Sequence, residues 1–164
     1  MDTYGDAILG FCTRILRDRS LAEDVLQQVF LEAYRDIERF QQRSSVRTWL
    51  FGIASHRCQD AIKSRRRREL RIESDDTAMT TFADPAAAPT DHLDRTRLVA
   101  ALEDCLRALS EEVRMSVLLR FQAGMSYEQM SASLDAKADT LQRRVSRALP
   151  ELRQCLERKG WTGE

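Results

Sequence analysis

Basic side chains that could hold the phosphates of a nucleic acid are concentrated between Phe40 and Arg68. Residues 55–68 contain six basic side chains against the single acid Asp60, a local net charge of +5, although the whole chain is formally neutral. The polar loop Gln41–Ser45 precedes them and offers hydrogen-bonding groups. Since Arg and Lys bind phosphates while other polar groups read bases, this segment predicts a surface for a nucleic-acid strand.

A second basic surface is expected on a helix spanning 137–149. A short helix precedes it, opened by the capping box Ser126–Gln129, and a tight turn at Asp135–Ala136 joins the two. The second helix carries a net charge of +3, from Lys137, Arg143, Arg144 and Arg147 against Asp139. Two short helices with a basic second helix are typical of a helix-turn-helix, which reads base edges in the major groove. Helical hairpins also occur as plain packing units, so the pattern alone leaves both interpretations open.

The helices that position the first basic surface follow from apolar spacing. A helix is predicted over 3–17, and a capping box at Ser20–Glu23 predicts the start of the next. That second helix carries a core stripe at helical spacing: Ala22, Val25, Leu26, Val29, Phe30, Ala33, Tyr34 and Ile37. Its other face is acidic and polar, with Asp24, Gln27, Gln28, Leu31 and Arg35. Such a face is either merely solvated or docks a basic protein surface, and Leu31 among polar neighbours favours docking.

The second half of the chain shows the same kind of pattern. One helix is marked by Leu98, Ala101, Leu102, Cys105, Leu106 and Leu109. Ser110 is the predicted N-cap of the next, with Glu111 and Glu112 in its first turn, where the helix dipole favours acids. Its predicted core face is Val113, Val117, Leu118 and Phe121, and Gly124 is its predicted C-terminal stop.

The segment between the halves has a different composition. Residues 73–94 contain six acids, no Lys or Arg, and the run Pro85–Pro89. Without an apolar period, this segment predicts a flexible acidic linker or one that folds on a partner. The sequence therefore predicts an all-α protein of two small helical domains, residues 1–70 and 93–164, joined by a linker at 71–92.

Composition narrows the function classes. No apolar run is long enough to span a bilayer, and the N-terminus lacks the pattern of a signal peptide, so a cytoplasmic protein without membrane insertion is expected. With His56 and His92 as the two histidines and no Gly-rich phosphate loop, we expect no catalytic residue, no metal, no cofactor and no small-molecule substrate. The four cysteines lack metal-ligand spacing and are predicted to be free and structural: Cys12, Cys58, Cys105 and Cys155.

Four stretches in order resemble the extracytoplasmic-function (ECF) sigma factors, small specificity subunits of bacterial RNA polymerase. Ala22–Leu31 resembles the polymerase-docking helix. Phe40, Thr48–Leu50 and Ile53–Ala54 are similar to the promoter-opening segment. The C-terminal domain and its helix-turn-helix are matched by Leu109–Arg114, Leu118–Arg120, Gly124–Ser131 and Thr140–Ala148. The family commonly has one long final helix where Pro150 stands here, so a kink or a restart is expected at Pro150.

The resemblance implies that the chain binds the clamp helices and flap of core RNA polymerase, directs the enzyme to promoter DNA, and has an anti-sigma factor as a partner. The first domain would be sigma region 2 and the second sigma region 4. The residues that would bind polymerase are Asp24, Gln27, Gln28, Leu31 and Arg35. The minus-ten element would be held by Arg43, Ser44, Ser45, Arg47, Trp49, His56, Arg57, Asp60, Lys63, Arg65 and Arg66. Trp49 could stack on a base, but it shares an apolar stripe, which favours a core position.

In the second domain the resemblance assigns Gln142, Arg143, Ser146 and Arg147 to the bases of the minus-thirty-five element, and Lys137, Thr140 and Arg144 to its phosphates. Arg144 could instead serve only the fold. The rival function is a helix-turn-helix regulator that acts on duplex DNA without joining polymerase. Such a regulator has no need of the Asp24 face or of the Trp49 segment, which favours the sigma factor.

Overall fold

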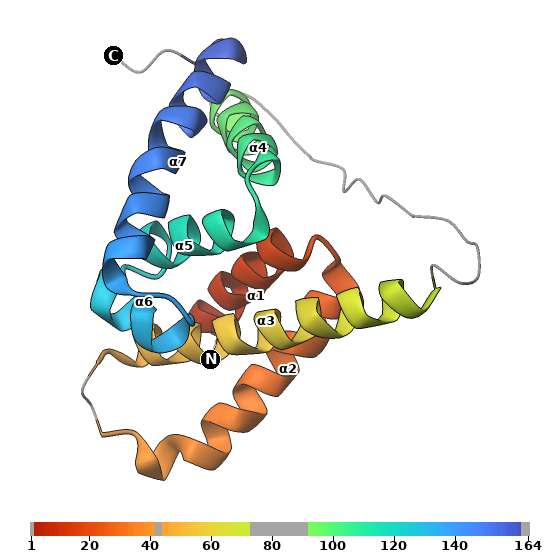
Figure 1. Ribbon diagram of the computed structural model, residues 1–164, viewed down its shortest axis with the longest axis vertical. Coiled ribbons are helices and arrows are strands. Elements are labelled where there is room, and N and C mark those ends of the chain that lie inside the picture. The colour runs from red at the N-terminus through yellow and green to blue at the C-terminus, as the bar shows by residue number, and fades with distance from the viewer. Residues whose placement is uncertain (1, 42–43, 73–91, 162–164) are drawn as a thin grey trace.

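All regular structure is helical in the part of the chain that the computed structural model describes, residues 2–41, 44–72 and 92–161 (Figure 1). This confirms the all-α prediction. The elements are α1 (Asp2–Leu16), α2 (Arg19–Asp36), the 3-10 turn η1 (Ile37–Arg39), α3 (Val46–Ile72), α4 (His92–Ala108), α5 (Glu111–Phe121), α6 (Tyr127–Ser133) and α7 (Ala138–Arg158). Among these described helices, none is both long enough and apolar enough to cross a membrane.

Helices α1, α2 and α3 pack on one another and form the N-terminal unit. The rings of Phe11 on α1 and Phe51 on α3 meet edge to face, with centroids 5.3 Å apart. The first helix ends because Arg17 adopts a left-handed backbone, with φ of 57°. Asp18 then caps α2, since its side chain accepts a hydrogen bond from the Leu21 N–H at 3.0 Å. The predicted cap at Ser20 is therefore wrong by two residues, and Glu23 pairs with Arg19 instead.

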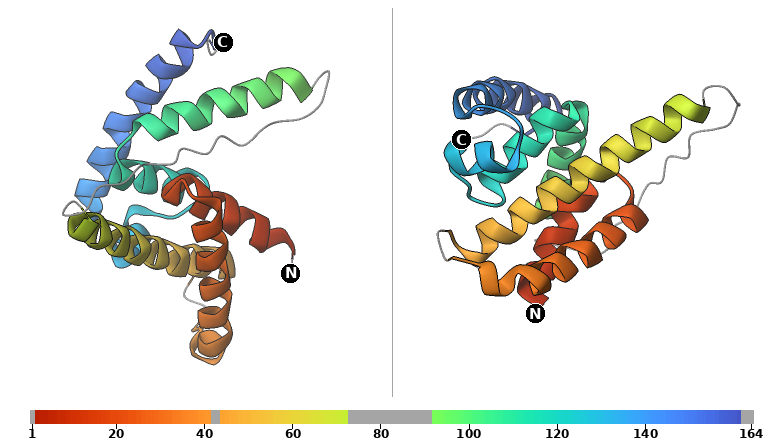
Figure 2. Two further views of the ribbon diagram at one scale, coloured as in Figure 1. Left: turned by 90° about the vertical axis from the view of Figure 1, so that its right-hand side faces the viewer. Right: turned by 60° about the horizontal axis from the view of Figure 1, so that its bottom comes forward.

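The predicted core stripe of α2 is correct for its first turns and wrong at its end. Ala22, Val25, Val29 and Ala33 are buried, but Tyr34 is 82% exposed and Ile37 is 52% exposed. The cause lies in the arrangement of the helices, because the end of α2 projects beyond the helices that cover its beginning (Figures 1 and 2). The apolar residues continue at helical spacing there, but no neighbouring helix buries them.

The C-terminal unit, α4 to α7, begins and ends its helices largely where the sequence predicts. The Ser110 hydroxyl accepts from the Val113 N–H at the start of α5, and Gly124, with φ of 73°, follows the helix in a left-handed conformation. The capping box of α6 is complete, with Ser126 and Gln129 bonded reciprocally. Helix α7 continues through Pro150 to Arg158, so the predicted end at residue 149 is wrong, and of the two alternatives expected at Pro150 a restart is excluded.

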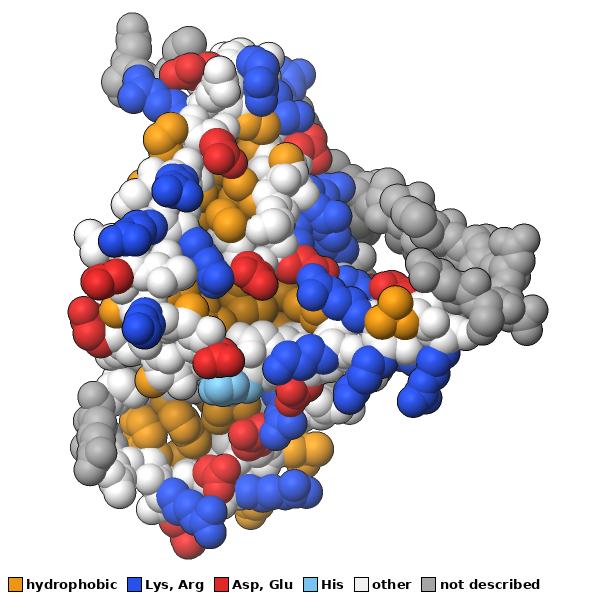
Figure 3. Space-filling model, viewed as in Figure 1, with side chains coloured by type: hydrophobic (Ala, Val, Ile, Leu, Met, Phe, Trp, Pro, Cys, Tyr) orange, Lys and Arg blue, Asp and Glu red, His pale blue; other side chains and the backbone are white. Residues whose placement is uncertain are grey.

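Three apolar residues that helical spacing marks in this unit lie at the surface, among them Phe121 of the predicted core face of α5. Phe121 is 61% exposed at the end of α5, and Leu98 and Leu102 on α4 are each 38% exposed. Figure 2 (left) shows the beginning of α4 extending away from α7, and Figure 3 shows hydrophobic side chains visible between the two helices. The spacing identified the inward side of α4, but α7 does not lie close enough to cover all of it.

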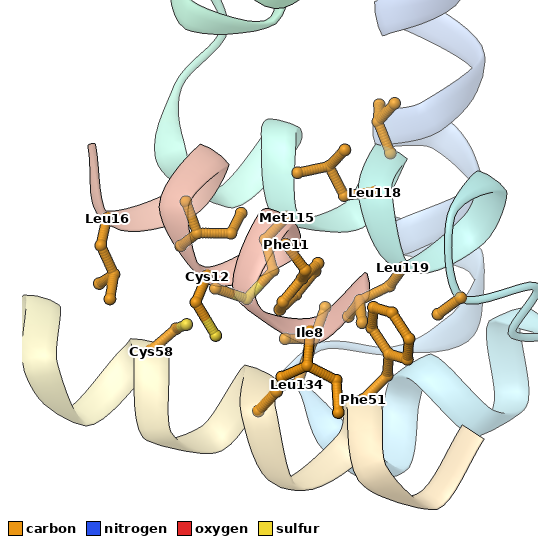
Figure 4. Packing of buried hydrophobic residues seen from close by; sticks show 14 of the residues in the cluster. Ile8, Phe11, Cys12, Leu16, Phe51, Cys58, Met115, Leu118, Leu119 and Leu134 are labelled. Carbon is orange, nitrogen blue, oxygen red and sulfur yellow. The ribbon is translucent and has the colours of Figure 1, made fainter. Parts of the chain in front are cut away.

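A disulfide joins α4 to α7 through Cys105 and Cys155, which are separated by 50 residues in sequence. The prediction that all four cysteines are free is wrong for this pair, because packing of the two helices brings together residues that sequence spacing does not associate. Cys12 and Cys58 are free and buried, as predicted. They face one another across α1 and α3 (Figure 4), and contact with Cys12 together with burial raises the pKa of the Cys58 thiol.

The two units share one hydrophobic core. Figure 4 shows Met115 and Leu119 of α5 directed toward Ile8 and Phe11 of α1 and toward Phe51 of α3. All five side chains are almost completely buried. Helix α6 also contacts α3, where a methyl group added to Gly52 would lie 3.3 Å from the Ser133 hydroxyl oxygen. The N-terminal and C-terminal units are therefore closed on one another.

Reduction of the Cys105–Cys155 disulfide should lower the free energy of unfolding by about 4 kcal/mol, the loop-closure value for a 50-residue separation. Urea unfolding with and without a thiol reductant measures this difference. The Cys105→Ala/Cys155→Ala double variant should unfold alike in both conditions. An equal response of the double variant to reductant would show that another thiol is responsible.

Candidate protein and nucleic-acid interface

The acidic-polar face of α2 is fully presented to solvent. Asp24, Gln27, Gln28 and Arg35 are exposed, and Leu31 is 57% exposed at the centre of the face. Tyr34 follows Leu31 by one turn and is more exposed still, so the same end of the helix offers an apolar centre with a polar rim. Sequence reasoning missed Tyr34 because its spacing is also that of the core stripe. The arrangement suits a protein partner, since aromatic side chains are enriched in interfaces.

The described end of the loop before α3 caps that helix. Ser45 caps α3, accepting a hydrogen bond from the Thr48 N–H at 3.1 Å, and Ser44 is half-buried beside it. Trp49 stacks on Phe40, with ring centroids 4.8 Å apart, and packs against the core. This favours the core position that its apolar stripe predicts. Arg43 lies outside the described residues.

Charged residues on the middle of α3 are partly neutralised by neighbours. Arg57 donates to the Glu32 carboxylate of α2 at 2.6 Å and to Asp60 at 3.4 Å. Lys63 and His56 are exposed on the same helix. His56 lines a cleft of about 640 Å³ together with residues 131–137, which include Lys137 of the helix-turn-helix. Residues assigned to two different DNA elements therefore meet at one cleft.

Three arginines assigned to the minus-ten element form hydrogen bonds with residues of other helices, mostly in the C-terminal unit. Arg47 donates to the Gln122 carbonyl at 2.8 Å and lies over the Phe51 ring. Arg65 donates to the Leu16 carbonyl at 3.0 Å. The carboxylate of Glu111 accepts from both Arg65, at 2.7 Å, and Arg66, at 2.6 Å. Sequence reasoning placed Glu111 only as a helix-start residue and missed these pairs, which join positions at least 45 residues apart.

The outer face of α7 presents its polar side chains without obstruction. Figure 3 shows basic side chains along this helix. The exposed residues of the assigned set are Lys137, Thr140, Gln142, Arg143, Ser146 and Arg147, while Leu141 and Val145 between them are buried. Arg144 is half-buried and pairs with Glu112 of α5 at 3.1 Å, so it also holds the fold. An exposed row of donors beginning near the helix N-terminus is suited to base edges in a major groove.

A buried arginine lies near the charged side chains of Arg17, Arg65 and Glu111. Arg114 of α5 is 2% exposed, and its Nε and Nη1 atoms have no hydrogen-bond partner. Burial, with help from the nearby charges of Arg17 and Arg65, lowers the pKa of Arg114 to about 10. The group therefore stays charged near neutral pH.

Among the described residues, no group of three or more His, Cys, Asp and Glu side chains is arranged to hold a metal ion.

Both units of the chain match known protein families. The model for Sigma-70 region 2 matches residues 1–68, and the model for Sigma-70 region 4 matches residues 100–152. The ECF RNA polymerase sigma factor SigK of Mycobacterium tuberculosis strain H37Rv is 31% identical over 156 residues, covering 92% of this chain and 80% of that protein. The RNA polymerase sigma-H factor of Pseudomonas aeruginosa is 27% identical, covering 94% and 82%.

Solved structures show the same fold. The sigma factor RpoE of Bartonella quintana, in complex with the anti-sigma factor NepR, gives a TM-score of 0.74 at 24% identity, covering 94% of this chain and 92% of that one. CnrH, in complex with the cytosolic domain of CnrY, gives 0.59 at 21% identity, covering 94% and 82%. With region 2 and region 4 matched in order and a relative 31% identical over most of both chains, the protein belongs to the ECF sigma factors of bacterial RNA polymerase.

Proposed function

We propose that this sigma factor divides promoter recognition among three surfaces: α2 docks core RNA polymerase, α3 and its preceding loop hold the opened minus-ten element, and α7 reads the minus-thirty-five element. Exposure of a complete row of base-reading candidates on α7, over a buried face that fixes the helix, carries the proposal most strongly. Arg to guanine and Gln to adenine can each be bidentate in the major groove.

Docking is supported by the charge and shape of α2. The face around Asp24 is exposed, is acidic and polar, and has an apolar centre at Leu31. In the family the clamp helices are basic where they meet this surface, so the charges are complementary. The flap of polymerase is proposed as the partner of the C-terminal unit.

Strand binding is supported by the charge on α3. His56, Lys63, Arg67 and Arg68 are exposed on it, and Arg47, Arg65 and Arg66 add further positive charge when they are released from the C-terminal unit. An anti-sigma factor is a proposed partner, since one solved structure with this fold is a complex with an anti-sigma factor and another is a complex with a cytosolic protein domain. We further propose that the chain acts in the cytoplasm, where polymerase works, and that it has no catalytic activity of its own.

The rival function, a regulator that binds duplex DNA without polymerase, is not favoured. Region 2 occupies residues 1–68, which such a regulator does not need. Run-off transcription with purified core polymerase tests the proposal, since addition of this chain should start transcripts at discrete promoters. Transcripts identical to those of the bare enzyme would refute it.

Arg143→Ala should reduce transcription about 5- to 150-fold from promoters that depend on the minus-thirty-five element, because one bidentate base contact discriminates by about 1–3 kcal/mol. Run-off assays on paired templates, with and without that element, measure the effect. Arg153→Ala is the matched control, because Arg153 is exposed on the same helix but pairs with Glu157. Equal loss of activity on both templates would contradict the assigned contact.

Asp24→Arg should weaken binding to core polymerase about tenfold or more, which corresponds to about 1.4 kcal/mol, because it reverses a charge on the docking face. Binding is measured by fluorescence anisotropy of labelled sigma factor. The control Asp6→Arg makes the same charge change at an exposed position on α1. If both variants bind polymerase as tightly as the wild type while circular dichroism is unchanged, α2 is not the docking face.

A further inference from the structure

Two free thiols face one another in the core of the N-terminal unit. Cys12 on α1 and Cys58 on α3 are each 0% exposed, and Figure 4 shows their sulfur atoms directed toward one another. A hydrogen bond with Cys12, together with burial, raises the pKa of the Cys58 thiol, so this sulfur carries a proton near neutral pH. Sequence spacing did not associate the two cysteines, because they lie on different helices.

A pair of thiols is a ligand set for a soft metal ion. Sulfur ligands select soft ions, whereas Mg²⁺ and Ca²⁺ take oxygen ligands. Among the described residues, no third His, Cys, Asp or Glu joins the two thiols in a metal-binding group. A structural Zn²⁺ takes four ligands, so zinc is not suited to the pair. The arrangement fits an ion that binds two sulfur atoms in a line.

The surroundings of the pair determine which ionic charge is suited to it. Phe11, Leu16 and Met115 lie in the same part of the core, and all three belong to the buried hydrophobic cluster (Figure 4). Burying an unbalanced charge among apolar side chains costs free energy. Two thiolates carry two negative charges, so a divalent ion gives a neutral complex, whereas a monovalent ion leaves one negative charge unbalanced. The apolar surroundings therefore favour a divalent ion.

We propose that Cys12 and Cys58 form a binding site for a soft divalent metal ion that takes two thiolates in a line, the coordination that Hg²⁺ adopts. Each thiol gives up its proton as its sulfur bonds to the ion, so two protons are released and no atom changes its oxidation state. Because both sulfur atoms are buried, the ion enters when α1 and α3 separate locally. The bound ion links α1 to the part of α3 that carries His56, Arg57 and Asp60. The site is independent of the proposed contacts with polymerase and DNA.

Titration of the full-length protein with mercuric chloride tests the site. One ion should bind per chain and release two protons. The midpoint of thermal unfolding, followed by circular dichroism, should rise by about 8 °C or more, because a bridge between positions 12 and 58 constrains the unfolded chain as a disulfide does. The loop that it closes is nearly as long as the 50-residue separation of Cys105 and Cys155. A lower midpoint, or no binding to the native protein, would show that the two thiols serve only packing and would overturn the proposal.

Cysteine variants assign the response to this pair. Cys58→Ala removes one ligand, so it should release one proton per bound ion and lose the rise in midpoint. The Cys105→Ala/Cys155→Ala double variant is the matched control, since it keeps the pair and should respond as the wild type does. A full response of Cys58→Ala, or loss of the response in the double variant, would overturn the assignment.

The coordination of the ion can be measured without any substitution, which keeps the proposal testable if Cys58→Ala does not fold. X-ray absorption spectroscopy of mercury bound to the wild type should show two sulfur neighbours. A single sulfur neighbour would mean that the two thiols do not share the ion, and the proposed site would be wrong.

The choice of ion is tested with Zn²⁺ and Ag⁺ in the same unfolding assay. Zn²⁺ should leave the midpoint unchanged, because two of its four ligands are missing. Ag⁺ should raise the midpoint less than Hg²⁺ does, because its complex leaves one negative charge in the apolar core. A zinc response as large as that to Hg²⁺ would refute the two-ligand site, and an equal silver response would refute the preference for a divalent ion.

Discussion

Burial of α5 on more than one side is the constraint on which the rest of the structure depends. Six consecutive residues of α5, 114–119, are buried, and Met115 and Leu119 among them are directed at α1 and α3. Six consecutive residues cover more than one helical turn, so apolar side chains leave α5 on several sides, and each is stabilised by removal from water. Closing the two units satisfies this requirement. It also sets the polar pairs, because Glu111 meets Arg65 and Arg66 only when α5 lies against the N-terminal unit.

Local signals predicted most of the helices, and long-range packing explains where they failed. Ser110, Gly124 and the Ser126 capping box act within a few residues of their own positions, so the sequence was sufficient to place them. Tyr34 and Phe121 have core spacing but project where no neighbouring helix reaches them. Periodicity tells which side of a helix is apolar, but the length of the neighbouring helix decides how much of that side is covered. The disulfide was missed for the same reason, since it depends on how α4 meets α7.

The candidate site was predictable in its charges but not in their partners. The sequence placed the basic residues on α3 and α7, where the structure has them. It could not show that carboxylates neutralise four of them: Arg57 by Glu32, Arg65 and Arg66 by Glu111, and Arg144 by Glu112. Each carboxylate lies on another helix, at least 25 residues away in sequence. A local net charge therefore overstates the positive potential that a strand would meet in the closed protein.

The two proposed DNA-binding surfaces differ in how much of each is occupied by contacts within the protein. On α7 the base-reading candidates Gln142, Arg143 and Arg147 stay exposed in the closed state, so duplex can be approached without any rearrangement. On α3 the C-terminal unit holds Arg47, Arg65 and Arg66, so an opened strand has to compete with protein acceptors for the same donors. On the proposed function, a strand can therefore bind these three arginines only by displacing the protein groups that they contact.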